Sequence, residues 1–220
     1  SHNGGALASE IVDRLATGDK ARAHFGLRPD LPTLLVFGGS QGAHAVNQVL
    51  FSVGEDLARA GVQVLHVVGP KNAEEPQDRT QGDVPYMVVP YVDRMDLAYA
   101  AADMALCRSG AMTCAELTAV GLPAAFVPLP IGNGEQRLNA EPIVAAGGGL
   151  VVDNDDLSAQ WIREQLLPIL SDTDRLVAMS EAAAAMGRSR ADEDLAREVL
   201  TVARGGRADG PAPIDQDDEY

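Results

Sequence analysis

Apolar runs alternate with helical patterns along most of the chain. Mostly apolar stretches without strict alternation are typical of strands that are covered on both faces of a sheet. We expect six strands of this kind, at residues 33–37, 62–68, 86–89, 104–107, 124–127 and 150–152.

The segments between these runs have helical spacing or composition. Behind the first run, apolar residues recur at helical spacing from Val46 to Leu57, until Gly61 ends the pattern. We also expect a short irregular helix in 71–83 and helices at 93–102, from the fourth strand to 120, and from 135 to the glycines 147–149. The stretch 158–204 should be helical in three segments, separated near Ser171 and Gly187. Repeated strand–helix units predict an α/β fold, a doubly wound parallel six-stranded Rossmann-like sheet.

Three distant loops follow strands of this sheet, at residues 38–42, 108–113 and 128–139. In doubly wound sheets, ligands bind outside the carboxyl ends of the strands. Because all three loops lie at that edge, we expect one cleft to gather them.

The segment from Arg108 to Glu116 carries the strongest chemical signal. A Ser109-Gly110 turn between a strand and a helix directs free backbone N–H groups and the positive end of the helix dipole at a ligand, which favours phosphate. Glu116, one turn into the helix, is placed to accept both hydroxyls of a ribose. The alternative is a capping box, Thr113-x-x-Glu116, in which the glutamate only satisfies a backbone donor at the helix start.

Two further segments have candidate ligand groups. The turn at residues 38–42 is neither the Gly-x-Gly-x-x-Gly fingerprint nor a triphosphate-binding loop, but its glycines allow close approach to a ligand and Ser40 can donate to an oxyanion. Gln136 and Asn139 are three residues apart at a helix start, so they share one face, and their amides can bind sugar hydroxyls. The alternative for Asn139 is a turn cap.

Charge and composition argue against several kinds of function. A formal net charge of -15 argues against nucleic-acid binding and disfavours adsorption to anionic lipid. Cys107 and Cys114 match no redox or zinc spacing, so we expect them to be reduced and packed. His66 is expected to be a satisfied core residue, and no general base, metal site or cofactor is evident. With no apparent signal peptide or membrane span, the sequence predicts a cytoplasmic protein.

Taken together, five ordered motifs resemble the donor half of the MurG glycosyltransferases. They are Gly38-Gly39-Ser40-Gln41-Gly42-Ala43, Tyr91-Val92-Asp93-Arg94-Met95, Arg108-Ser109-Gly110-Ala111-Met112-Thr113-x-x-Glu116, Gly121-Leu122-Pro123 and Glu135-Gln136-x-x-Asn139-Ala140. The resemblance implies the C-terminal domain of an inverting GT-B hexosyltransferase. Such an enzyme transfers N-acetylglucosamine from UDP-N-acetylglucosamine to lipid I, giving lipid II in peptidoglycan synthesis, and needs no cofactor.

The resemblance also implies roles for individual residues. Ser40 and its glycine turn would face the diphosphate, the backbone at Val92 with Met95 nearby would meet uracil, and Glu116 would hold the ribose. Residues 111–113 would donate to phosphate and sugar, while the amides at 136 and 139 would contact the N-acetylglucosamine hydroxyls. The expected substrate-binding residues are Gly39, Ser40, Gln41, Val92, Met95, Ser109, Gly110, Ala111, Met112, Thr113, Glu116, Gln136 and Asn139.

The resemblance, together with the excess of acidic residues in the last sixteen positions, predicts how the chain is divided. We expect residues 1–32 to be a lead-in from an interdomain segment, 33–204 to be the donor-binding domain, and 205–220 to be a disordered acidic tail. The general base, the lipid I site and the membrane contact, at the cytoplasmic face, would belong to an N-terminal domain, so this chain alone should be inactive. Glu135 stands where relatives have glutamine or histidine, which leaves its role open. The alternatives are a non-catalytic nucleotide-sugar binding module and another UDP-N-acetylglucosamine enzyme, such as an epimerase.

Overall fold

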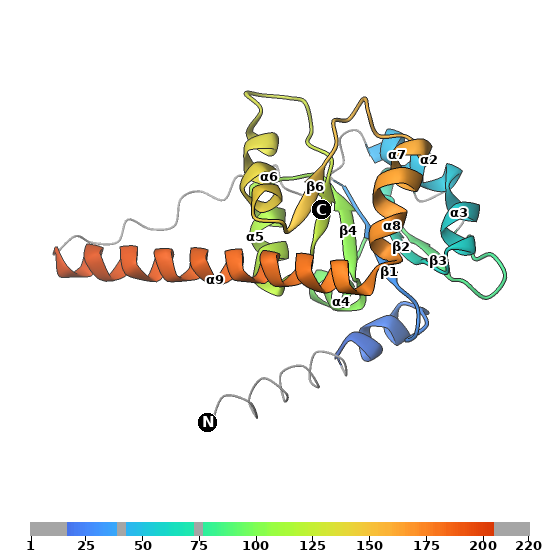
Figure 1. Ribbon diagram of the computed structural model, residues 1–220, viewed down its shortest axis with the longest axis horizontal. Coiled ribbons are helices and arrows are strands. Elements are labelled where there is room, and N and C mark those ends of the chain that lie inside the picture. Colours follow the sequence, from blue (N-terminus) through green and yellow to red (C-terminus); the bar gives the residue numbers. More distant parts are fainter. Residues whose placement is uncertain (1–16, 39–42, 73–76, 205–220) are drawn as a thin grey trace.

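The computed structural model describes residues 17–38, 43–72 and 77–204, which form a six-stranded parallel sheet with helices on both faces (Figure 1). The strand order is β3-β2-β1-β4-β5-β6. The strands are β1 (Thr33–Val36), β2 (Gln63–Val67), β3 (Tyr86–Val89), β4 (Met104–Cys107), β5 (Ala124–Phe126) and β6 (Gly149–Val151). Each lies within or next to a run predicted from the sequence, and the doubly wound parallel sheet is confirmed.

The order of the strands reverses direction at the centre of the sheet. β1 pairs in parallel with β2 on one side, where Leu34 is opposite Val64, and with β4 on the other, where Leu34 is opposite Met104. Chain connections therefore leave β1 and β4 toward opposite sides. Such a switch point opens a crevice at the carboxyl edge of the sheet, which is where ligands bind in this architecture.

Two apolar clusters cover the two faces of the sheet. Successive strand residues point to opposite faces, so Leu34 and Val36 join one cluster while Leu35 joins the other. The helical elements are α2 (Ala43–Ser52), α3 (Gly54–Arg59), the 3-10 turn η1 (Pro70–Asn72), α4 (Met95–Ala101), α5 (Ala111–Val120), α6 (Glu135–Ala145), α7 (Ala159–Trp161), the π-helical turn η2 (Ile162–Leu166), α8 (Leu167–Leu170) and α9 (Thr173–Ala203). The first cluster receives α2, α3, η2 and α8, and the second receives α4, α5 and α6.

The helix predicted from Val46 to Leu57 is two helices. The backbone at Val53 (φ -105°, ψ 10°) leaves the helical conformation between α2 and α3, and Gly54 follows, a residue with weak helix propensity. Leu50 on α2 and Leu57 on α3, which lie on either side of the break, are both fully buried. The change of direction therefore lets both short helices keep an apolar face on the sheet.

The predicted helix in residues 71–83 is also shorter than expected. Among the described residues of this range, only the end of η1 is helical, and residues 77–83 take part in two isolated antiparallel bridges, Asp78 with Met87 and Gln81 with Val84. This segment adds to the edge strand β3 through backbone hydrogen bonds rather than forming a helix of its own.

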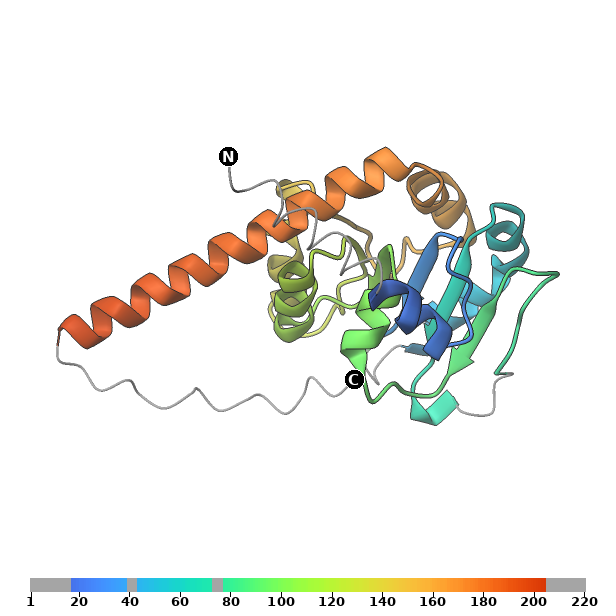
Figure 2. The ribbon, with the colours of Figure 1, turned by 90° about the horizontal axis from the view of Figure 1, so that it is seen from below.

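The expectation of a helix break near Gly187 is wrong, because α9 runs through it without interruption and extends past the sheet (Figure 2). A Cβ atom at Gly187 would overlap the backbone carbonyl of Thr118 on α5. The glycine is needed for close contact between the two helices, not for a turn. In the same contact, Ser180 donates to the Gly121 carbonyl at 2.7 Å.

The described part of the lead-in, residues 17–32, packs against the sheet. Its helix, residues 17–24, buries Ala21, and Leu27 beyond it is also buried. Arg22 donates to the Ala101 carbonyl at 3.0 Å and pairs with Asp103 at 3.2 Å. Burial raises the pKa of Asp103, while the Thr33 N–H and Arg22 oppose that change. This segment therefore contributes to the core at the amino edge of the sheet.

Within the described residues, no helix has both the length and the apolarity that crossing a bilayer requires.

Candidate functional site

The N-terminus of α5 lies at the carboxyl edge of β4 and is open to a ligand. Gly110 is its N-cap residue, and a glycine has no side chain that could accept a hydrogen bond from the first turn. The first N–H groups of a helix have no partner within the helix, so those of Ala111, Met112 and Thr113 are directed outward. Met112 is 44% exposed. Helix N-termini of this kind are suited to bind anions, and phosphate contact at these three residues stays a prediction.

The capping-box alternative is wrong. Thr113 is the third residue of α5 rather than its N-cap, and Glu116 lies in the second turn. Instead, the Oε2 atom of Glu116 accepts a hydrogen bond from the hydroxyl of Tyr99 at 2.5 Å. Glu116 is half-buried on the side of α5 that faces α4.

Ser109 is not available to a ligand, which corrects the expectation of free donors at this residue. It is fully buried, and its N–H donates to Oε1 of Gln136 at 3.2 Å. Its hydroxyl donates to the Gln136 carbonyl at 2.7 Å, and its own carbonyl accepts from Nδ2 of Asn139 at 3.1 Å. Ser109 therefore attaches the β4–α5 loop to α6. Gly110 is also buried and serves as the helix cap.

Gln136 and Asn139 do share one face of α6, as predicted, but Ser109 determines which of their atoms remain for other partners. The Oε1 atom of Gln136 accepts from both Ser109 and the N–H of Leu129, the latter at 2.9 Å. Among the described residues, no hydrogen bond engages Nε2 of Gln136 or Oδ1 of Asn139. Gln136 is thus left to act as a donor and Asn139 as an acceptor. Asn139 caps no turn.

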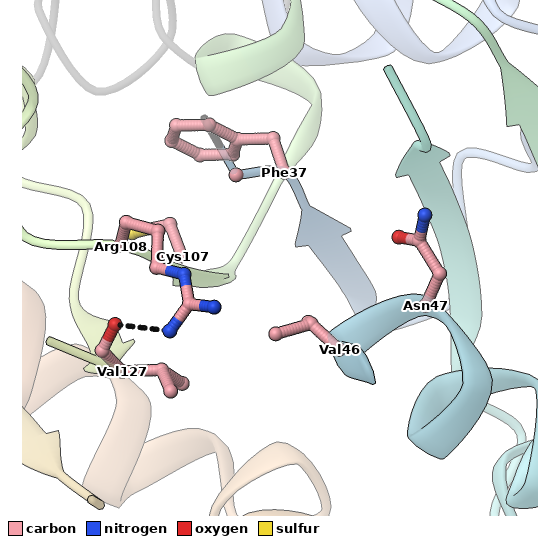
Figure 3. Close-up of a pocket in the computed structure, with 7 residues that line it drawn as sticks. Phe37, Val46, Asn47, Cys107, Arg108 and Val127 are labelled. Atoms are coloured by element: carbon pink, nitrogen blue, oxygen red, sulfur yellow. Dashed lines mark hydrogen bonds between the residues drawn. The ribbon is translucent and has the colours of Figure 1, made fainter. Parts of the chain in front are cut away.

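Arg108 begins the segment that the sequence singled out, but the sequence interpretation gave its side chain no ligand role. Its side chain leaves the end of β4 and points into a small pocket at the switch between β1 and β4 (Figure 3). Nη1 donates to the Val127 carbonyl at 3.2 Å and to Oδ1 of Asn154 at 2.7 Å. Burial lowers the pKa of Arg108, but a guanidinium remains charged near neutral pH. A cation directly after a buried apolar run was the signal that could have identified it.

The remaining predicted residues fall into two groups. Gly39, Ser40 and Gln41 lie outside the described residues, although their neighbour Gly38 lines the Arg108 pocket. Val92 and Met95 are half-buried at the start of α4, where they pack against the cluster that contains Tyr99. Of the three predicted loops, the structure joins 108–113 to 128–139 directly through Ser109.

His66 is confirmed as a satisfied core residue. Because Nδ2 of Asn47 donates to the Val68 carbonyl at 3.1 Å, Oδ1 of Asn47 is the acceptor for Nε2 of His66 at 2.8 Å. Nδ1 then accepts from the Tyr86 hydroxyl at 2.7 Å. Burial, with a smaller effect from Arg79, lowers the pKa of His66 to about 3, so the ring is neutral at physiological pH.

The two cysteines are free and buried, as expected. In the part of the chain that the structure describes, no three His, Cys, Asp or Glu side chains come together as a metal site would require.

The strand order and the open helix N-terminus beside a buried arginine define an α/β domain of the nucleotide-binding type. Residues 33–195 match the Glycosyltransferase family 28 C-terminal domain, and the chain belongs to this family. With its six-stranded parallel sheet, it is the C-terminal domain of a GT-B glycosyltransferase.

Two relatives and one solved structure show how far the similarity extends. The chain is 72% identical over 208 residues to the UDP-N-acetylglucosamine--N-acetylmuramyl-(pentapeptide) pyrophosphoryl-undecaprenol N-acetylglucosamine transferase of Thermobifida fusca, covering 94% of this chain and 55% of the relative. It is 61% identical over 182 residues to the Streptomyces avermitilis protein of the same name, covering 83% of this chain and 50% of that relative. The crystal structure of Acinetobacter baumannii MurG has a TM-score of 0.62 at 27% identity, covering 71% of this chain and 48% of that one. The chain spans about half the length of these relatives.

Proposed function

We propose that this chain is the donor-binding half of a glycosyltransferase that transfers N-acetylglucosamine from UDP-N-acetylglucosamine to lipid I, giving lipid II in peptidoglycan synthesis. The observation that carries the proposal is the 72% identity to a transferase of that name over nearly the whole chain. The geometry of the carboxyl edge of the sheet supports it, because a helix N-terminus, a carboxylate and a pair of oriented amides lie there.

The diphosphate of the donor occupies the N-terminus of α5. Backbone N–H groups at Ala111, Met112 and Thr113 donate to its oxygens, and the helix dipole favours its negative charge. Arg108 adds a full positive charge from the adjacent pocket. The resemblance adds Ser40 and its glycine turn as further contacts to the diphosphate, at residues that lie outside the described ranges.

These groups also account for how the chain assists the reaction. When the acceptor hydroxyl attacks the anomeric carbon, the bond to the diphosphate breaks and negative charge develops on the departing oxygen. Donors fixed before the reaction stabilise that charge without having to reorganise. Direct attack with departure from the opposite face inverts the anomeric configuration.

The uridine and the sugar lie on either side of the diphosphate. Glu116 accepts the ribose hydroxyls, while the backbone at Val92, with Met95 nearby, contacts uracil. On the other side, Nε2 of Gln136 donates to the N-acetylglucosamine hydroxyls and Oδ1 of Asn139 accepts from them. These opposite roles suit hydroxyl groups, which both donate and accept.

The acceptor half of the reaction lies outside this chain. The general base, the lipid I site and the contact with the cytoplasmic face of the membrane belong to an N-terminal domain, such as the relatives' additional length can provide. We therefore expect this chain by itself to bind donor but to turn over little or none.

Thermal unfolding with a panel of nucleotides tests the proposal. A ligand present at about 100 times its dissociation constant adds roughly 2.7 kcal/mol to the free energy of unfolding. UDP-N-acetylglucosamine and UDP should raise the melting temperature, whereas NAD and GDP-sugars should not. Equal effects of all four, or none from the uridine nucleotides, would contradict the proposal. Conversion of free UDP-N-acetylglucosamine without an acceptor would instead indicate an epimerase.

A further inference from the structure

The contact between Tyr99 and Glu116 joins two helices on the same face of the sheet. Tyr99 lies on α4 and Glu116 on α5, and their side-chain oxygens are 2.5 Å apart. A hydroxyl that donates to a carboxylate at this distance forms a short, charge-assisted hydrogen bond, about twice as strong as one between neutral groups.

The position of the Tyr99 hydroxyl is fixed by the packing of its ring. Tyr99 is 6% exposed, and its ring centroid lies 6.1 Å from that of Phe37, with the planes tilted by 59°. Phe37 directly follows β1, and the neighbours Ala98 and Ala101 on α4 are fully buried. The hydroxyl is therefore presented to Glu116 from a rigid support, while Glu116 itself is a flexible side chain at a half-exposed position.

We propose that Tyr99 is a positioning residue for donor recognition. Its hydroxyl holds the Glu116 carboxylate in the orientation that accepts the ribose hydroxyls of a uridine nucleotide. A carboxylate offers about four acceptor positions, so a bond from Tyr99 leaves it able to accept more. Because Glu116 is oriented before the ligand arrives, less side-chain entropy is lost on binding. The inference rests on the proposed function.

The test removes one oxygen atom and compares two ligands. In Tyr99→Phe the ring and its packing stay, and only the hydroxyl is lost. Calorimetric titration should show about tenfold weaker binding of UDP, which corresponds to about 1.4 kcal/mol. Binding of 2′,3′-dideoxy-UDP, which lacks the hydroxyls, should not change. In a Glu116→Ala background, Tyr99→Phe should have no further effect on UDP, because coupled residues are not additive.

Tyr86→Phe is the matched control. Tyr86 is also buried, at 4% exposure, and its hydroxyl bonds to His66 rather than to Glu116. The Tyr86→Phe variant should have a lower melting temperature and an unchanged dissociation constant for UDP. If Tyr99→Phe behaves in the same way while Glu116→Ala weakens UDP, the positioning role is overturned and the proposed function stands. If Glu116→Ala binds UDP like the wild type, or if the wild-type chain binds no uridine nucleotide, both proposals fail.

Discussion

Gln136 holds Ser109 at two points, by accepting its N–H at 3.2 Å and its hydroxyl at 2.7 Å. The first contact uses the Gln136 side chain and the second its backbone carbonyl. Ser109 precedes the helix whose N-terminus is the proposed anion site, and Gln136 lies in the first turn of α6. The proposed diphosphate and sugar contacts are therefore parts of one rigid unit, so a change at their junction should affect both.

Ser109→Ala removes the buried hydroxyl at this junction. The Gln136 carbonyl then loses one of its donors and a small void is left at a buried position, so the free energy of unfolding should fall by about 0.5–1.5 kcal/mol. Chemical denaturation measures this. In Ser52→Ala the hydroxyl is lost from an exposed serine that donates to Val49 in the preceding turn, and little change is expected. Equal effects of the two substitutions would contradict a special role for Ser109.

Asn139→Ala tests the sugar contact. It removes the acceptor Oδ1 proposed for an N-acetylglucosamine hydroxyl, so UDP-N-acetylglucosamine should bind about tenfold more weakly, which is about 1.4 kcal/mol. Free UDP has no sugar at that position and loses only the support that Nδ2 of Asn139 gives to the Ser109 carbonyl, so it should be affected less. Titration of both ligands provides the comparison, and Leu138→Ala, at a neighbour that is 60% exposed, is the control. Equal losses for the two ligands would remove Asn139 from the sugar site.

Arg108→Met keeps much of the apolar stem but removes the buried charge. Hydrogen bonds to charged groups contribute about 1.5–3 kcal/mol, so UDP should bind roughly 10–100 times more weakly, whereas uridine, without phosphate, should bind as before. The control is Arg59→Met on α3, where the guanidinium is exposed and lies 3.5 Å from Glu55. A uniform loss for UDP and uridine would argue that Arg108 only supports the fold.

His66 should make stability depend on pH in the acid range. In the folded state its pKa is lowered to about 3, whereas in the unfolded chain it is near 6.5. Between these values the unfolded state binds a proton that the folded state does not, so acidification favours unfolding by up to about 1.4 kcal/mol per pH unit. The free energy of unfolding should be measured by denaturation of the wild type and of His66→Gln from pH 7 to pH 4. Only the wild type should show this additional fall in stability as the pH is lowered. Parallel profiles would show that the burial of His66 has no such effect.

Gly187→Ala should destabilise the chain although alanine favours helices. The added methyl group meets the Thr118 backbone, and α9 must move away from α5 at a cost of about 1–3 kcal/mol. At the exposed Ser189 two residues later, Ser189→Ala should instead stabilise α9 by roughly 0.5 kcal/mol. Thermal unfolding of both variants measures the contrast. A stabilised Gly187→Ala variant would contradict the close contact between α5 and α9.

Buried strands were predictable because a parallel sheet that is covered on both faces requires continuous apolar runs. The residues of β3 and β4, Tyr86–Val89 and Met104–Cys107, coincide with the predicted runs. Helix interruptions were less predictable, because glycine has two opposite uses. At Gly61, with φ of 70°, it ends a helix, whereas at Gly187 it allows a neighbouring helix to approach. Only the position of α5 distinguishes these two uses.

By itself, the sequence determined the class of fold and the edge of the sheet at which a ligand site is proposed, since these depend on local patterns of apolar residues, glycines and turns. Only the tertiary structure decided which atoms remain to bind. It turned Ser109 from a ligand donor into a support for two amides, brought Tyr99 to Glu116, and directed Arg108 into the pocket between β1 and β4. The reason is that a hydrogen bond between residues distant in the chain consumes a donor or acceptor that local sequence leaves apparently free.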